Sequence, residues 1–271
     1  EIRDLIINDI NTRTNKSKRF KEAEDFIFNF GDAFILLSEG ISEHYKKNIN
    51  NKPHAIITNG FDQDLINSIN NEIDVSQNNL SLNNLYNKKD LVFVHLGSIY
   101  SGRNISDFLH GLNLFLKNNA QYNGIVKLIG DLDTQALHDI NNFIESISSS
   151  DIKQRLLIQI IPPMNNKMAM IELSKADIAL ILTHKNGSEY AIPGKAFEYI
   201  GMEKPILAIS EDSNLVNLIS GKFGVCSVHE MKEVSKKINQ LLVMQIDYSL
   251  KDQYSRVKKA QEILSFIEGL N

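Results

Sequence analysis

The chain has 271 residues, of which 42% are hydrophobic and 23% are charged, and its formal net charge is −4. These values are typical of a globular protein with one large or two ordinary domains, and the charge gives no reason to expect a nucleic-acid partner. No apolar run approaches the ~18 residues needed to cross a bilayer, and the first residues do not resemble a signal peptide. The single cysteine, Cys226, excludes an internal disulfide, so we expect a cytoplasmic protein.

The first part of the chain combines helical and strand patterns and ends in a polar stretch. Apolar spacing predicts helices over 17–30 and 40–48, and short apolar runs predict strands over 33–37 and 54–58. Residues 63–88 are rich in asparagine and weakly patterned, so we expect them to be a linker without regular structure.

From residue 91 onward, apolar strands alternate regularly with amphipathic helices. Strands are expected over 91–96, 125–129, 156–160, 178–182, 205–209 and 224–228. Helices are expected over 105–118, 133–147, 166–175, 212–220, 230–243 and 250–268, with another from Pro193 onward. This alternation predicts an α/β fold with a Rossmann-like parallel sheet and helices on both faces. In such sheets ligands bind at the carboxyl ends of the strands.

One loop at that edge carries a pattern that suits an anion beside a sugar. Pro193 and Gly194 can begin a helix, whose free N–H groups and dipole favour an anion. Lys195 adds a positive charge, and Glu198 lies one turn further on, where it can accept hydrogen bonds from hydroxyl groups. Ordinary helix punctuation, with a glutamate that complements the dipole, is the other interpretation, and these residues alone leave both open.

A second loop, 97–103, follows the strand at 91–96 and carries two glycines and an arginine. Arg103 can bind two phosphate oxygens at once through its planar guanidinium. The loop lacks a G-x-G-x-x-G sequence, which argues against a nicotinamide enzyme. Close helix packing at Gly97 and a surface position for Arg103 would be the purely structural explanation.

Together these segments resemble glycosyltransferase family 4, whose members have the two-domain GT-B fold. The most specific match is Pro193-x-Lys195-x-Phe197-Glu198-Tyr199, followed by Lys204-Pro205. The segment 95–103 looks like the loop that holds the donor diphosphate, and 56–62 is close to a Val-Ile-Pro-Asn-Gly-x-Asp segment of the family. Arg3-Asp4 and residues 31–39 are similar to family segments in outline.

The resemblance implies a donor site assembled from both loops. Gly97, Ser98, Arg103, Gly194, Lys195 and Ala196 would contact the diphosphate, Glu198 the ribose, Glu189 and Tyr190 the donor sugar, and Pro162 and Pro163 the surroundings of the base. The sequence departs from the family where Ser98 replaces an arginine and Arg103 a lysine. Glu189 and Glu198 are also nine positions apart, where many members have two glutamates eight apart, so Tyr190 takes the expected place.

The resemblance also implies a domain arrangement. Residues 1–62 would be the remnant of an N-terminal acceptor domain, 63–88 the linker and 89–248 the donor-binding domain. Residues 249–271 would form a C-terminal helix that packs back toward the N-terminal part. The catalytic residues would lie in a missing N-terminal part, so we expect this chain alone to be inactive.

The implied activity is that of a retaining glycosyltransferase of the hexosyltransferase type. It would move a sugar from a UDP- or GDP-linked donor to a glycan or lipid-linked acceptor in cell-surface polysaccharide synthesis, without a metal ion or other cofactor. A basic cluster near the start of the chain would allow peripheral membrane contact in the full-length protein, although a solvated loop is the explanation that the sequence favours. Two alternatives remain open: a sugar-nucleotide epimerase of GT-B architecture and a non-catalytic nucleotide-binding module.

Overall fold

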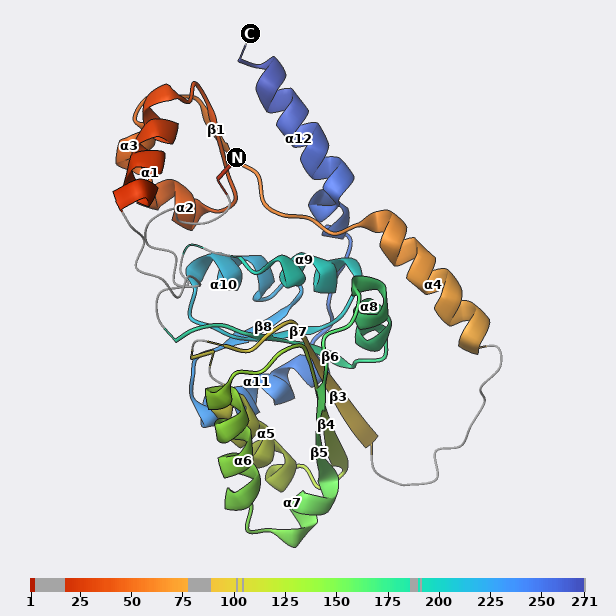
Figure 1. Ribbon diagram of the computed structural model, residues 1–271. Coiled ribbons are helices and arrows are strands. Elements are labelled where there is room, and N and C mark those ends of the chain that lie inside the picture. The colour runs from red at the N-terminus through yellow and green to blue at the C-terminus, as the bar shows by residue number, and fades with distance from the viewer. Residues whose placement is uncertain are drawn as a thin grey trace.

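The computed structural model describes residues 1–2, 18–77, 89–100, 102–103, 105–185, 190 and 192–270. These residues form a parallel six-stranded sheet with helices on both faces and a small N-terminal unit with its own two-stranded parallel sheet (Figure 1). The expected α/β class with a doubly covered parallel sheet is confirmed. None of the described helices is long and apolar enough to cross a membrane.

The main sheet is built from apolar segments whose order reverses in the middle. Its strands are β3 (Lys89–Leu96), β4 (Tyr122–Ile129), β5 (Leu156–Ile161), β6 (Ile178–Leu182), β7 (Ile206–Ile209) and β8 (Gly224–Ser227). All neighbours pair in parallel, in the order β5-β4-β3-β6-β7-β8. The strand order changes direction between β3 and β6, and in open parallel sheets ligands bind in the crevice at such a reversal.

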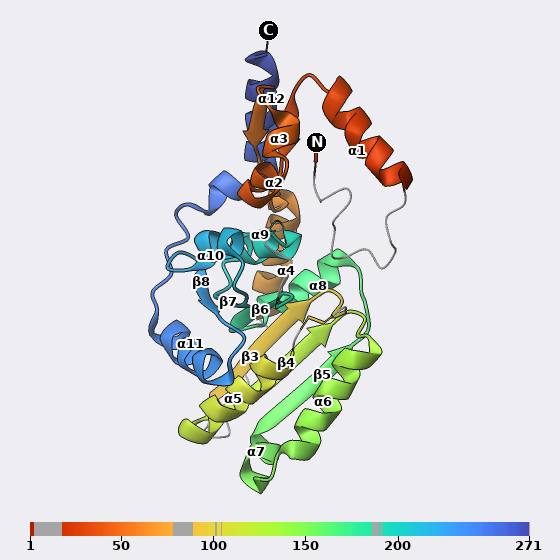
Figure 2. The same cartoon turned by 90° about the vertical axis from the view of Figure 1, so that its left-hand side faces the viewer.

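Two layers of helices bury the two faces of this sheet (Figures 1 and 2). One face is covered by α5 (Ser106–Asn118), α6 (Thr134–Ser146), α7 (Ser150–Arg155) and α11 (Met231–Val243). The other is covered by α8 (Asn166–Ser174), α9 (Gly194–Gly201) and α10 (Ser213–Ile219), with α4 (Gln63–Gln77) beside α8. Strands β6 and β7 are buried along their whole length because helices cover both of their faces.

The N-terminal unit has a separate small core. It contains α1 (Lys18–Phe30), β1 (Phe34–Leu36), α2 (Glu39–His44), α3 (Lys46–Ile49) and β2 (His54–Ile56). Ile2 extends its sheet by pairing with Leu36. The single helix expected over 40–48 is divided at Tyr45, whose buried ring packs against Phe28 in this core.

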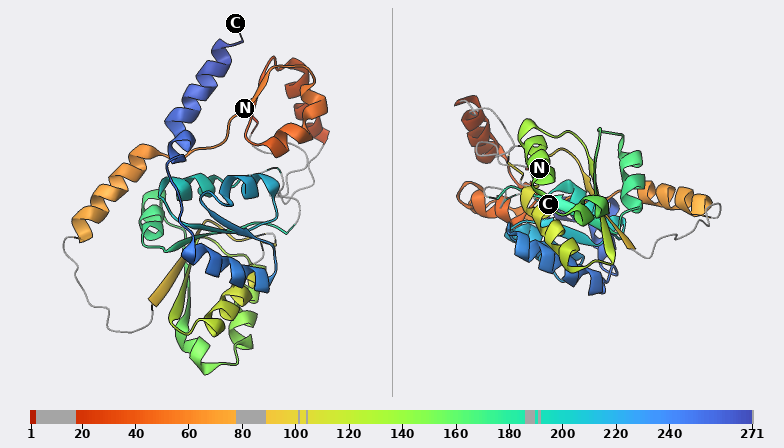
Figure 3. Two further views of the ribbon diagram at one scale, coloured as in Figure 1. Left: turned by 180° about the vertical axis from the view of Figure 1, so that it is seen from behind. Right: turned by 90° about the horizontal axis from the view of Figure 1, so that it is seen from below.

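The C-terminal segment crosses back toward the N-terminal unit (Figure 3). A short 3-10 helix, η1 (Lys251–Tyr254), precedes α12 (Arg256–Glu268). The continuous helix expected over 250–268 is interrupted at Ser255, whose side chain accepts a hydrogen bond from Lys258 N and begins α12. Phe61 N donates to Tyr254 O and Arg256 N donates to Phe61 O, both at 2.9 Å, so the two connecting segments lie side by side.

The structure differs from the sequence expectation over residues 63–77. These were expected to lack regular structure, but they form α4. Asp62 Oδ1 accepts from Leu65 N at the helix start, and Ile66 and Ile69 are buried against the α8–α10 layer. The burial of these isoleucines, with Leu65 beside them, anchors a helix that is otherwise rich in polar residues. Residues 78–88, the rest of the expected linker, lie outside the described residues.

Candidate functional site

Strands β3 and β6 separate at the reversal point of the sheet, and side chains complete their hydrogen bonding. The two strands pair only at Phe93–Ile178 and Val94–Ala179. Beyond these pairs, the hydroxyl of Tyr199 accepts from Leu96 N at 2.9 Å, and Nδ1 of His95 lies 2.9 Å from Leu180 O. The gap between the strands is therefore held at a fixed width by buried polar groups.

The turn after β3 depends on two glycines, one within the turn and one after the neighbouring strand β4. Gly97 has a φ of +94°, a left-handed conformation that strains other residues. Gly130, after β4, packs so closely that a Cβ there would lie 2.6 Å from the Gly97 carbonyl carbon. Gly97 N donates to Ile129 O at 2.8 Å, so this turn is fixed against the end of β4.

Lys195, in the first turn of α9, extends to the Gly97 turn. Its Nζ lies 3.2 Å from Nε2 of His95, and a Cβ added to Gly97 would lie 3.3 Å from that amine. Burial, then the nearby Arg103 guanidinium, lowers the pKa of Lys195 to about 7, while Glu198 acts in the opposite direction. The amine is thus a positive group that is close to neutralisation and already placed beside the backbone of the turn.

Arg103 lies at the far end of the same loop. Its guanidinium donates to Ser98 O at 3.0 Å and lies 4.5 Å above the ring of Tyr100. Its backbone pairs with His184, in the segment that follows β6. Arg103 Nε is buried and has no hydrogen-bond partner among the described residues.

The first turn of α9 offers fewer amides than the sequence analysis expected. Ala196 N donates to Pro193 O at 2.9 Å, so this N–H is used within the helix start and is not available to phosphate. Gly194 is exposed, and a Cβ there would contact nothing within 4 Å. The N–H groups of Gly194 and Lys195 are therefore the ones that the helix start can present to an anion.

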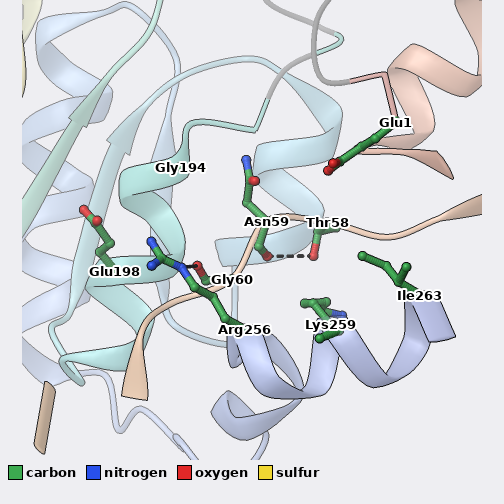
Figure 4. A pocket seen from close by; sticks show the side chains of 10 residues that line it. Glu1, Thr58, Asn59, Gly60, Gly194, Glu198, Arg256, Lys259 and Ile263 are labelled. Carbon is green, nitrogen blue, oxygen red and sulfur yellow. Dashed lines mark hydrogen bonds between the residues drawn. The ribbon is translucent and has the colours of Figure 1, made fainter. Parts of the chain in front are cut away.

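Glu198 lies one turn further along α9, in a cleft of about 470 Å³ that α9 shares with residues 58–60 and α12 (Figure 4). Burial raises the pKa of its carboxyl, while Arg256, an Asn166 hydrogen bond and Lys195 act to lower it. Figure 4 shows the Arg256 side chain lying between Gly60 and Glu198. It donates to Gly60 O at 3.3 Å and pairs with Asp62 at 3.2 Å.

Of the two predicted donor-sugar residues, the described part of the chain contains Tyr190, which lies away from this site. The ring of Tyr190 is 6% exposed and packs in the core of the N-terminal unit, and Ser38 Oγ donates to its carbonyl. Tyr190 is therefore a link between the two units, which differs from its expected place beside a sugar. Glu189 lies outside the described residues.

The predicted base-proximal residues, Pro162 and Pro163, are exposed after β5, the outermost strand. The connection from their segment to the site is made by Asn166, the first residue of α8, through its hydrogen bond to Glu198. No position for a base follows from these two prolines themselves.

The structure brings four predicted residues to one place: Gly97, Arg103, Lys195 and Glu198. Lys195 is within electrostatic range of both Arg103 and Glu198, so these two side chains lie on the same side of the molecule. The sequence analysis included His95 in the segment 95–103 but gave its side chain no role, because its apolar neighbours in the strand do not show which partners a buried imidazole has. Among the described residues, no three His, Cys, Asp or Glu side chains form a group that could hold a metal ion.

The reversed strand order, the second small α/β unit and the crossing back of α12 define a GT-B fold with a Rossmann-like sheet. HepE from Anabaena in complex with UDP matches this chain with a TM-score of 0.67 and 15% identity, over 97% of this chain and 71% of that protein. Its complex with UDP-glucose matches with a TM-score of 0.65.

A UDP-forming trehalose-phosphate synthase from Burkholderia xenovorans, in complex with glucose-6-phosphate, matches with a TM-score of 0.58 and 9% identity, over 89% of this chain and 60% of that one. Likeness at such identities shows the fold alone. No family model matches the chain, and no curated protein does.

Proposed function

We propose that this chain binds a nucleoside-diphosphate sugar and is the donor-binding part of a glycosyltransferase. The observation that carries the proposal is the convergence of the Gly97 turn, Lys195, Arg103 and Glu198 at the reversal point of a GT-B sheet. Positive groups and free amides at such an edge suit a diphosphate, and a neighbouring carboxylate suits the ribose hydroxyls.

In this proposal the site acts mainly on the leaving group. Breaking the bond to the sugar leaves negative charge on the diphosphate, and groups fixed in advance lower the barrier without rearranging. Lys195 and Arg103 would stabilise that charge from the Gly97 side, together with the N–H groups of Gly194 and Lys195. Because protein cations supply the positive charge, we expect donor binding without a divalent metal ion.

The neighbours favour uracil as the base. Structures of the Anabaena protein contain UDP and UDP-glucose, and the Burkholderia enzyme is UDP-forming. We therefore propose a UDP-sugar ahead of a GDP-sugar. A glycan or lipid-linked acceptor and retention of the anomeric configuration follow from the family resemblance and remain part of the proposal.

Calorimetric titration with UDP-glucose, UDP, GDP, ADP and inorganic pyrophosphate tests the site. Arg103→Ala should weaken all diphosphates by about tenfold or more, the loss typical of a charge-assisted hydrogen bond. Glu198→Gln should weaken the nucleotides more than pyrophosphate, because only nucleotides carry a ribose, while both lose the support that Glu198 gives to the Lys195 ammonium. EDTA should not alter the affinities.

Lys236→Ala is the control, since this exposed lysine lies on α11 and pairs only weakly with Glu233 at 3.4 Å. The proposal is wrong if the unaltered chain binds none of these nucleotides. It is also wrong if Arg103→Ala and Glu198→Gln both bind UDP-glucose as the control does.

A further inference from the structure

His95 occupies a buried position that the proposed donor site does not yet explain. Its side chain lies at the carboxyl end of β3, in the gap that opens toward β6, and it is fully buried. A buried imidazole needs partners for both nitrogens, since an unpaired polar group away from water is costly. The two partners lie on different elements, β6 and α9.

The partner on β6 fixes which ring nitrogen carries the proton. Nδ1 lies 2.9 Å from Leu180 O, and a carbonyl oxygen only accepts hydrogen bonds, so Nδ1 is the donor. In the neutral ring Nε2 is then an acceptor, and Lys195 Nζ lies 3.2 Å from it. Burial, then the charges of Lys195 and Arg103, holds the pKa of His95 well below its ordinary value, so the ring stays neutral.

Three groups from three places surround the Lys195 amine. His95 accepts from it on β3, the Arg103 guanidinium approaches from the loop after β3, and the Glu198 carboxylate lies one turn away on α9. The amine also lies against the Gly97 turn, where a side chain would come within 3.3 Å of it. An ammonium has three hydrogens, so one bond to His95 leaves two for phosphate oxygens.

We propose that His95 is a positioning residue: its Nε2 accepts a hydrogen bond from Lys195 and fixes the amine beside the Gly97 turn, where the amine meets the donor diphosphate. The inference rests on the proposed function for the identity of the anion. The placement of the amine itself rests on the contacts of His95 and can be tested without a ligand.

Two substitutions separate the two nitrogens of the ring. In His95→Asn the amide nitrogen can replace Nδ1 and keep the bond to Leu180 O, but no atom reaches Lys195. In His95→Gln the longer side chain can place its amide oxygen near the Nε2 position and accept from Lys195. Both variants remove the ring, so a general packing loss affects them alike. His138→Asn, at an exposed position of α6, is the matched control.

Calorimetry at neutral pH gives the first readout. His95→Asn should bind UDP-glucose about tenfold or more weakly than the unaltered chain, the usual loss for a hydrogen bond to a charged group. His95→Gln should recover most of that affinity. Equal affinity of the asparagine variant and the unaltered chain would overturn the inference, and so would a glutamine variant as weak as the asparagine variant.

The pH dependence of binding is a readout that packing alone would not move. Binding needs the ammonium form, and the pKa of Lys195 is about 7, so affinity for UDP-glucose should fall as pH rises above 7 by up to about tenfold per pH unit. UDP-glucose suits this test because its disubstituted diphosphate stays ionised throughout. In His95→Asn the ammonium loses its acceptor while burial and Arg103 still disfavour it, so the pKa of Lys195 should fall further and the loss of affinity should begin at a lower pH. An unchanged pH profile in His95→Asn counts against the inference.

A ligand-free titration separates the inference from the proposed function. NMR of protein labelled with ¹³C at the lysine side chains, assigned with Lys195→Arg, follows the Lys195 proton directly. The unaltered chain and His95→Gln should titrate near pH 7, and His95→Asn should titrate at a lower pH because its ammonium has lost an acceptor. If no UDP compound binds, the proposed function fails while this titration still decides whether His95 holds the amine.

Discussion

Lys195 keeps a positive charge away from water and close to a second cation. Burial and the Arg103 guanidinium both disfavour the ammonium, and these effects lower the pKa of Lys195 to about 7. This charge reduces the stability of the ligand-free protein, because a buried cation retains a desolvation penalty that its neighbours do not remove. Residues that reduce stability in this way are common where a ligand supplies the missing opposite charge.

Replacing Lys195 by methionine should abolish tight UDP-glucose binding and should remove the charge penalty, while it also leaves the buried His95 Nε2 without its partner. The lost partner acts at every pH, so we expect the variant, relative to the unaltered chain, to melt about 2–4 °C higher at pH 7 than near pH 10.5, which corresponds to ~1 kcal/mol in a chain of this size. The folded pKa lies below the ordinary 10.5, so the penalty is complete below pH 7 and is lost as pH rises toward 10.5. The charge-dependent part of the difference should fade over the same range.

Calorimetric melting at both ends of this range checks the prediction, with Lys236→Met as the exposed control. A difference from the unaltered chain that favours the variant more near pH 10.5 than at pH 7 would contradict it. Equal differences at both pH values would show that packing, and not charge, is responsible.

At the level of single residues, the sequence predicted those roles that follow from the residue type and its local position. It missed the roles that depend on contacts with residues far away along the chain. Lysine and glutamate in the first turns of a helix suggest an anion and hydroxyl site, and the family resemblance decided between that site and ordinary helix punctuation. His95 shows no such sign, because its partners Leu180 and Lys195 lie 85 and 100 positions away along the chain. The role of Tyr190 was missed for the same reason, since its contact with Ser38 spans 152 positions.

Among the elements, the segment between β6 and α9 joins the two parts of the molecule. Its Tyr190 enters the core of the N-terminal unit beside Phe28, Leu36 and Ile41. Gly40 N, at the start of α2, also donates to Asn214 on α10 at 3.2 Å. The N-terminal unit is thus attached to the same helix layer that carries Lys195 and Glu198.

Truncation of Tyr190 to alanine should loosen this attachment. Removing a buried aromatic ring typically costs about 3–5 kcal/mol, and here the cavity would open between the two units. We expect faster hydrogen exchange in α1 to α3 and little change in β6 and β7. Tyr190→Phe keeps the ring and should lose much less. Equal protection of α1 to α3 in the two variants would show that the ring does not hold the N-terminal unit.

Elements whose apolar residues follow one another were the ones that sequence predicted well. Strands β6 and β7 are continuous apolar runs, and a run of this kind suits a buried parallel strand. Helix α4 was missed because its apolar residues, with Ile66 and Ile69 among the described ones in the core, are interspersed with many asparagines and do not establish a clear period. Its stability comes from packing on α8, which the sequence alone does not contain.

For the whole molecule, alternation of strands and helices predicted the doubly covered sheet, and the family resemblance predicted the GT-B arrangement. The strand order and the gap between β3 and β6 could not be predicted from the sequence alone, since both depend on which strands pair. The meeting of the two connecting segments at Phe61 could not be predicted either, because residues 61 and 255 pair across most of the chain.

This meeting point should be sensitive to a single methyl group. A Cβ on Gly60 would lie 2.6 Å from Tyr254 O and 3.1 Å from Arg256 N, both backbone atoms that cannot turn away. Gly60→Ala should therefore lower stability by about 1–3 kcal/mol, as overpacking usually does. Thermal unfolding measures it, with Gly269→Ala as the control because its nearest neighbours lie at 3.4 and 3.5 Å. Equal melting temperatures of the two variants would refute the predicted clash.

The paired segments at Phe61 also restrict how the molecule can open. The two hydrogen-bonded connecting segments form a hinge. We therefore expect the N-terminal unit to rotate about the axis of this hinge and to rotate little in other directions. Glu198 shares its cleft with residues 58–60 and α12, so such a rotation would widen the ribose side. The groups that position Lys195, namely His95 and the Gly97 turn, belong to the sheet domain. We therefore expect the proposed diphosphate contacts to keep their geometry during this rotation.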